Sequence, residues 1–123
     1  MSGWLIVGLV GALGAMGRHA IDIGSRRRFP NGPSVGILTV NLLGSFVLGV
    51  IVGLSATRYI DPDLRLAVAV GFCGSFTTFS TFVAELAGLV DQRASRMLVG
   101  WTAAMVIGGG VLASIGIIVG RSW

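Results

Sequence analysis

Charged residues are scarce in this chain of 123 residues, because Asp, Glu, Lys and Arg together make up only 11% of it. A soluble domain carries about 25% charged residues, which cover the surface that faces water. Hydrophobic residues make up 54% of the chain, and the mean hydropathy is +0.89. The shortage of charge therefore argues against a soluble domain and indicates an integral membrane protein.

Lysine is absent, so the formal net charge of +4 comes from arginines set against five acidic residues. The arginines lie between apolar blocks, which is typical of cations that flank a membrane and not of a nucleic-acid surface. Cys73 is the only cysteine, which excludes an internal disulfide and a thiolate metal cluster. His19 also stands alone. No nucleophile–base pair or nucleotide motif is visible, so we expect no enzyme activity.

Four apolar blocks are present instead, at about residues 4–23, 35–57, 64–90 and 97–119. Each is close to or above the ~20 residues that cross a bilayer as a helix. The connections are short and carry the Pro, Asn and Asp residues typical of turns. We therefore expect residues 1–123 to form one transmembrane domain of four helices in a multi-pass membrane protein, without a cleaved signal peptide.

The arginines that flank these blocks show little preference for one side of the membrane. If the blocks alternate in direction, one side holds Arg58, Arg65 and Arg121, and the other holds Arg26, Arg27, Arg28, Arg93 and Arg96. Because arginine bias sets the orientation of a membrane protein, such a chain is able to insert both ways. This favours an antiparallel dimer, which would also enclose more interior than four short helices do alone.

Polar side chains at membrane depth are costly and mark a pathway, a partner or a packing bond. The amide of Asn41 carries donors and an acceptor, so it either makes a hydrogen bond between helices or faces an anion or water. Arg18 either anchors the first helix at the interface or pairs with Asp22 four residues later. Glu85 is an acid toward the end of the third block.

Residues 71–82, GFCGSFTTFSTF, place hydroxyl and phenylalanine side chains around a Gly-Ser break. An unwound turn here would free backbone carbonyls, which are hard oxygen ligands that suit a small cation. Phe79 and Phe82 are three residues apart and therefore lie on one helix face. They either pack as ordinary apolar side chains or present their positive ring edges to a small anion that has shed its water.

The chain is similar in these motifs to the Fluc (CrcB-type) fluoride channels. The resemblance rests on residues 71–82 followed by Glu85, on residues 11–15 with Arg18, and on residues 39–44 with Ser45. It covers the first three helices, and the length and four-helix layout fit the whole chain.

The resemblance implies a fluoride-selective channel in the cell (inner) membrane that passively exports cytosolic fluoride and so reduces its toxicity. It implies an antiparallel, dual-topology homodimer with two pores, each drawing on both subunits. It also implies a broken third helix at the dimer centre, where the backbone carbonyls of Gly74 and Thr77 hold a structural sodium ion.

The resemblance further assigns roles along the fluoride path. It implies ring edges from Phe79 and Phe82, an amide from Asn41, hydroxyls from Ser80 and Thr81, a vestibule cation from Arg18 and an acid near the pore end from Glu85. The fourth helix departs from the family, which often has a tyrosine and serines there. Either this polar track is shorter here, or the N–H of Trp101 replaces the phenol.

Three other readings stay open. The departure in the fourth helix makes the chain a candidate for one half of a heteromeric fluoride channel. A small four-helix, proton-coupled cation or multidrug exporter would have the same size, but it would need a carboxylate central to the bundle, and Glu85 lies toward the end of its block. A structural subunit held by its glycine faces would not need the cluster of hydroxyls and rings.

Overall fold

The computed structural model describes residues 2–123, and these form helices and no strand. Four helical spans are long and apolar enough to cross a membrane: Gly3–Arg28, Val35–Thr57, Pro62–Asp91 and Ser95–Arg121. The first, second and fourth are α1, α2 and α6, and the third comprises α3 (Pro62–Leu66), the π-helix η1 (Ala67–Cys73), α4 (Gly74–Phe76) and α5 (Phe79–Asp91). The predicted all-α membrane protein with four spans is confirmed.

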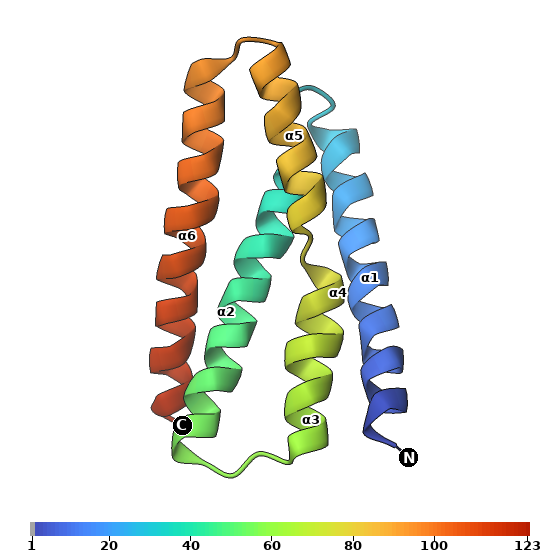
Figure 1. Cartoon of the computed structure of the whole chain (residues 1–123), viewed down its shortest axis with the longest axis vertical. Helices are drawn as coiled ribbons and strands as arrows, with labels where there is room; N and C mark the ends of the chain where they lie inside the picture. Colours follow the sequence, from blue (N-terminus) through green and yellow to red (C-terminus); the bar gives the residue numbers. More distant parts are fainter. Residues whose placement is uncertain (1) are drawn as a thin grey trace.

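The spans alternate in direction, so that both termini lie at the same end of the bundle (Figure 1). α2 packs along α6, while α1 packs along η1 and α4. The third span therefore stands between the two outer helices, and its α5 part reaches toward α6 at the end opposite the termini (Figure 1).

The helix ends follow local chemistry. α2 has the predicted bounds, and the hydroxyl of its N-cap Ser34 accepts a hydrogen bond from the Ile37 amide at 3.1 Å. α1, by contrast, runs to Arg28 and not to residue 23. Its last turn carries three arginines, which interact favourably with the negative end of the helix dipole, and the helix stops just before Phe29-Pro30.

Small residues let α2 and α6 approach closely. A Cβ at Gly49 or Gly53 would clash with backbone carbonyls of α6, and one at Gly116 would clash with the Phe46 carbonyl of α2. Gly49 and Gly53 lie four residues apart, so they form a small-residue packing face on α2. The glycines of α1 are used less evenly, because Gly14 packs on η1 whereas Gly8 has no atom within 4 Å of a Cβ position.

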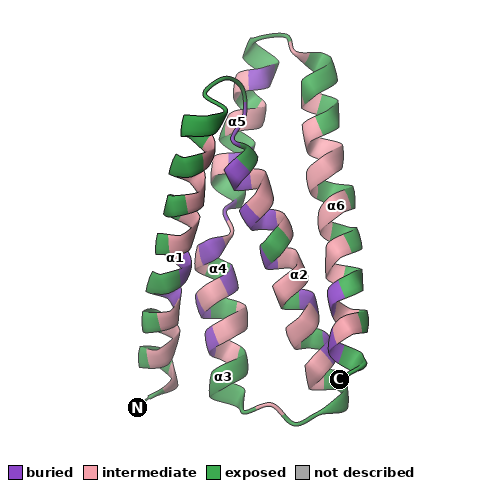
Figure 2. Ribbon diagram, turned by 180° about the vertical axis from the view of Figure 1, so that it is seen from behind, coloured by how far each residue is buried: buried purple, intermediate pink, exposed green. Residues whose placement is uncertain are grey.

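Little of the chain is buried (Figure 2). The buried apolar side chains are Ile37, Val40, Ala67, Cys73, Phe76, Phe82 and Leu89. Large apolar side chains such as Leu13 on α1 and Val106 on α6 are exposed instead, at 63% and 67%. In a membrane protein these faces meet lipid or another chain.

Candidate functional site

The site forms where the third span loses its helical hydrogen bonding. Thr77 and Thr78 have extended backbone between α4 and α5, with ψ of 157° and 116°. In a continuous helix the Thr78 N–H would donate to the Gly74 carbonyl. It donates instead to Oδ1 of Asn41 at 2.8 Å, and no described hydrogen bond reaches the Gly74 carbonyl.

The extended residues Thr77 and Thr78 form a joint between α4 and α5, and Asn41 of α2 holds this joint through both ends of its amide. Besides the bond to the Thr78 N–H, its Nδ2 donates to the Thr78 carbonyl at 3.0 Å. The side chain is buried, at 2% exposure, so water does not compete for these bonds. Of the two interpretations of Asn41, the structure shows the interhelical hydrogen bond. The amide has a second N–H that no described hydrogen bond uses.

Three hydroxyl groups gather at the start of α5. The Thr78 hydroxyl accepts from the Thr81 amide at 3.4 Å and donates to the Thr81 hydroxyl at 3.2 Å, and it lies 3.4 Å from the Ser80 hydroxyl. Thr78 is the N-cap of α5, and the Thr81 N–H donates to its hydroxyl. The Thr81 N–H therefore does not donate to the Thr77 carbonyl, which would be its acceptor in a regular helix. Ser80 is exposed and Thr81 is half-buried.

The rings of Phe79 and Phe82 lie next to each other but differ in exposure. Their centroids are 6.5 Å apart with planes inclined at 33°. Phe82 is 2% exposed and packs inside the chain, whereas Phe79 is 70% exposed. In the single chain, therefore, only Phe79 presents its ring to the open side of the joint.

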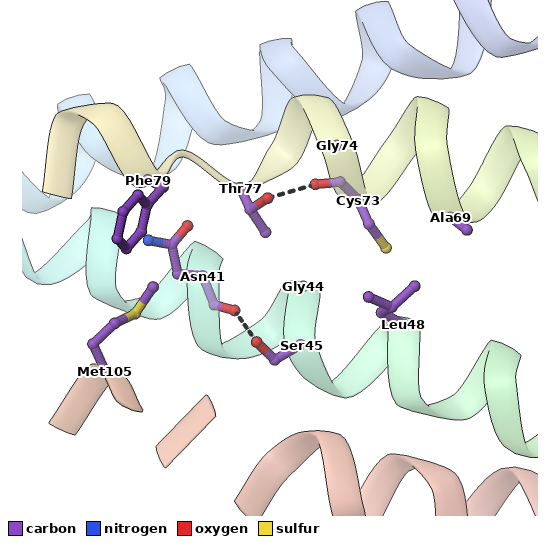
Figure 3. Close-up of a pocket in the computed structure, with 10 residues that line it drawn as sticks. All are labelled: Asn41, Gly44, Ser45, Leu48, Ala69, Cys73, Gly74, Thr77, Phe79 and Met105. Atoms are coloured by element: carbon purple, nitrogen blue, oxygen red, sulfur yellow. Dashed lines mark hydrogen bonds between the residues drawn. The ribbon is translucent and has the colours of Figure 1, made fainter. Parts of the chain in front are cut away.

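An open pocket of about 280 Å³, here called the central pocket, lies between α2 and the third span (Figure 3). Its lining residues are Asn41, Gly44, Ser45, Leu48, Ala69, Cys73, Gly74, Thr77, Phe79 and Met105. Four predicted site residues meet here, namely Asn41, Gly74, Thr77 and Phe79. Phe82, Ser80, Thr81, Arg18 and Glu85 do not line it.

Sequence reasoning missed Gly44 and Met105 as pocket residues. Gly44 leaves room for the Thr77 side chain, because a Cβ at position 44 would clash with it. Met105 reaches the pocket from α6 (Figure 3). The sequence did carry two signals for Gly44: it stands three residues after Asn41 and therefore on the same side of the helix, and it belongs to residues 39–44, on which the family resemblance rests.

Glu85 lies in a separate polar cluster. Its Oε1 accepts hydrogen bonds from Nη2 of Arg26 at 3.0 Å and from the Ser34 amide at 3.1 Å. Asp22 pairs with Arg26 at 3.0 Å and not with Arg18, so of the two interpretations of Arg18 the structure does not show the pairing with Asp22. An acid placed four residues before a base is the more favourable order on a helix, which agrees with the choice of Arg26.

Two buried side-chain atoms of the described residues have no hydrogen-bond partner, Oε2 of Glu85 and Nε1 of Trp101. Buried polar groups are usually paired, so each is a candidate to meet a ligand or water. Arg18 is half-buried on α1, and it takes part in neither of the salt bridges among the described residues.

The residues fit a cation only through backbone oxygen. Within residues 2–123, no group of three or more His, Cys, Asp or Glu side chains is placed to hold a metal ion. The Gly74 and Thr77 carbonyls lack their helical donors, Gly74 is exposed, and both residues line the central pocket. Two such oxygens suit a hard cation, but they leave its coordination incomplete within one chain.

Comparison with known proteins finds sequence similarity over nearly the whole chain. A family described as "CrcB-like protein, Camphor Resistance (CrcB)" matches residues 5–117. Relatives include proteins named "Fluoride-specific ion channel FluC 1" from Geobacillus kaustophilus, 41% identical over 95% of this chain and 97% of the relative, and "Fluoride-specific ion channel FluC" from Gloeothece citriformis, 34% identical over 92% of each chain. The chain therefore belongs to the CrcB-like family.

Proposed function

We propose that this protein is a fluoride-selective channel that lets fluoride leave the cytosol passively. Relatives that match almost the full length carry the name fluoride-specific ion channel. The observation that carries the proposal is the joint at Thr77 and Thr78, which Asn41 holds open against a pocket at membrane depth. Irregular backbone at such depth is tolerated where it is buried in protein or lines a cavity.

The residues around the joint offer what a dehydrated small anion needs. Phe79 has an exposed ring whose edge carries partial positive charge, and Asn41 has a free N–H. The hydroxyls of Ser80 and Thr81 stand on the next helical turn and supply further donors. In our proposal Phe82 adds a second ring edge beside Phe79, and Arg18 and Glu85 act at the wider ends of the path.

Passive conduction is sufficient for export. Hydrogen fluoride crosses bilayers as a neutral acid and ionises in a less acidic cytoplasm, where the anion accumulates. A channel in the cell (inner) membrane then lets the anion leave down its gradient and so lowers fluoride toxicity.

We further propose an antiparallel, dual-topology homodimer in which the joint breaks the third span at the dimer centre. The central pocket is open in the single chain, and Phe79 is 70% exposed beside it, so a second copy is the natural cover for both. The weak arginine bias between the two sides is compatible with insertion in either direction.

A structural sodium ion fits this dimer. The Gly74 and Thr77 carbonyls of each chain would supply oxygen ligands, so two copies together would offer four. The role of the ion would be to hold the two open joints together, and it would not move with fluoride.

The alternatives to a homodimeric channel are a proton-coupled cation exporter and a heteromeric fluoride channel. A proton-coupled cation exporter needs a carboxylate free to exchange protons at the centre of the bundle, whereas Glu85 is bound to Arg26 and the Ser34 amide near one end. A heteromeric fluoride channel is separated from the homodimer by testing this chain alone.

The test uses purified protein, as the only protein in liposomes loaded with fluoride and without a proton gradient. A fluoride electrode in the outer solution should record rapid release once a potassium ionophore relieves the charge imbalance. Release that needs a proton gradient, or transport of organic cations in its place, would support the exporter. No release from vesicles that contain folded protein would contradict a channel made by this chain alone.

A further inference from the structure

Four residues near the end of the bundle opposite the termini form a closed ring of polar contacts, here called the Glu85 clamp. Arg26 joins the two acids, with Nε 3.0 Å from Asp22 and Nη2 3.0 Å from Glu85. Ser34 joins the same two acids, since its hydroxyl donates to Asp22 at 2.6 Å and its amide donates to Glu85 at 3.1 Å. The clamp thus ties the end of α1 and the start of α2 to the middle of α5.

α5 depends on such ties because the chain before it is not helical. A continuous helix would transmit its rotation from η1 and α4 into α5, but the extended Thr77 and Thr78 interrupt that path. Among the residues that the structure describes, two sets of polar contacts then hold α5 and its N-cap against α1 and α2. One is the amide of Asn41 at its first turn, and the other is the Glu85 clamp.

The clamp acts on the buried face of α5. Phe82, Glu85 and Leu89 follow one another at spacings of three and four residues, so they share one face of the helix. Phe82 and Leu89 are 2% and 3% exposed, and the side chain of Glu85 is 12% exposed. Phe79 lies beside this face and is open, so a rotation of α5 about its axis would change where the Phe79 ring points.

We propose that Arg26 is a positioning residue for the ion path, an inference that rests on the proposed fluoride channel. By holding Glu85 in the clamp, Arg26 fixes the rotation of α5 and thereby the direction of Phe79 and the Ser80 hydroxyl.

The electrostatics explain why a cation is needed at this position. Arg26 is the one cation in a described salt bridge with either acid of the clamp. Oε2 of Glu85 is buried without a partner, so without Arg26 the carboxylate would keep only the Ser34 amide. Without Arg26, α5 therefore loses its charged tie to α1 and is held on this side only through the Ser34 amide, so its rotation is no longer fixed.

The neighbouring arginine provides a matched control. Arg27 is exposed and makes no salt bridge among the described residues, so Arg27→Gln makes the same charge change beside the clamp. We expect Arg26→Gln to slow fluoride efflux from liposomes by about tenfold or more, a smaller loss than the ~100-fold that misplacement by ~1 Å causes at a reacting centre. Arg27→Gln should stay within about twofold, since isolated surface charges contribute little.

A second pair of variants separates positioning from folding and from charge. Arg26→Lys keeps a cation near both acids and should recover much of the flux. Arg26→Gln combined with Glu85→Gln removes the uncompensated charge but leaves the clamp broken, so it should conduct as slowly as Arg26→Gln. Recovery of wild-type flux in this double variant would show that the clamp only neutralises charge, and it would overturn the positioning role.

A readout on the ring itself completes the test. Fluorine NMR of a fluorophenylalanine at position 79 should shift in Arg26→Gln and not in Arg27→Gln. Equal flux and equal resonances in the two variants would overturn the inference while leaving the channel intact. If the wild-type chain passes no fluoride, the proposed function falls, and an unchanged resonance in Arg26→Gln would still overturn the positioning of Phe79.

Discussion

Replacing Asn41 by leucine would remove both hydrogen bonds to the Thr78 backbone while keeping a side chain of similar length in the same buried place. The Thr78 N–H has no other acceptor among the described hydrogen bonds, so it would be buried and unpaired. An orphaned buried donor together with the lost bond to the carbonyl costs about 2–4 kcal/mol. A shift of ~1.4 kcal/mol changes a population ratio tenfold, so the native joint would be disfavoured at least tenfold relative to other arrangements of these residues.

The assay compares Asn41→Leu with Ser45→Ala, which alters the same pocket. The Ser45 hydroxyl donates only to the Asn41 backbone carbonyl four residues earlier, at 2.9 Å, a local bond whose loss matters little. We expect Asn41→Leu to lower the thermal stability of the detergent-solubilised protein and to slow fluoride efflux about tenfold or more. If Asn41→Leu matched Ser45→Ala in both measurements, the pairing of Asn41 with Thr78 would not be what holds the joint.

Three further predictions follow from the same geometry. Phe79→Ile should slow fluoride efflux without loss of thermal stability, because the Phe79 ring is 70% exposed. Phe82→Ile should slow efflux and also destabilise the protein by about 0.5–3 kcal/mol, because the Phe82 ring is 2% exposed. Normal flux in both variants would refute the role of ring edges. Gly49→Ala should lower the free energy of unfolding by about 1–3 kcal/mol through a clash with the Ala113 carbonyl. Gly110→Ala is the control and should have little effect, because a Cβ there meets nothing within 4 Å. Equal melting curves for the two variants would argue against the tight α2–α6 contact. Replacing sodium by a large organic cation should reduce fluoride efflux and loosen the dimer, and indifference to the exchange would remove the proposed ion from the Gly74 and Thr77 carbonyls.

Local signals in the sequence were enough to predict the helices. The bounds of α2 follow from an unbroken apolar run that begins after a Ser cap and ends before a polar loop. The predicted end of α1 was wrong for a local reason. The apolar run ends at residue 23, whereas the arginines of the last turn continue the helix to Arg28. Apolar content reports which residues enter the membrane, and it does not report where the helix ends in water.

The contacts of the site depended on register between helices, which the sequence does not reveal. Asn41 was recognisable as a costly polar group, but its partner Thr78 is fixed only by how far α2 slides along the third span. The same holds for Glu85, whose partner Arg26 lies 59 residues away. Phe79 and Phe82 were correctly placed as neighbours by their spacing, yet only packing decides that one ring is buried and the other open.

Selective conduction by this chain is tested by measuring fluoride and chloride release from the same liposomes, with this chain as their only protein. We expect fast fluoride efflux and chloride efflux close to that of protein-free vesicles, because ring edges and hydroxyl donors replace the water of a small anion better than that of a larger one. Equal release of the two halides would contradict the proposed path at the joint between α4 and α5.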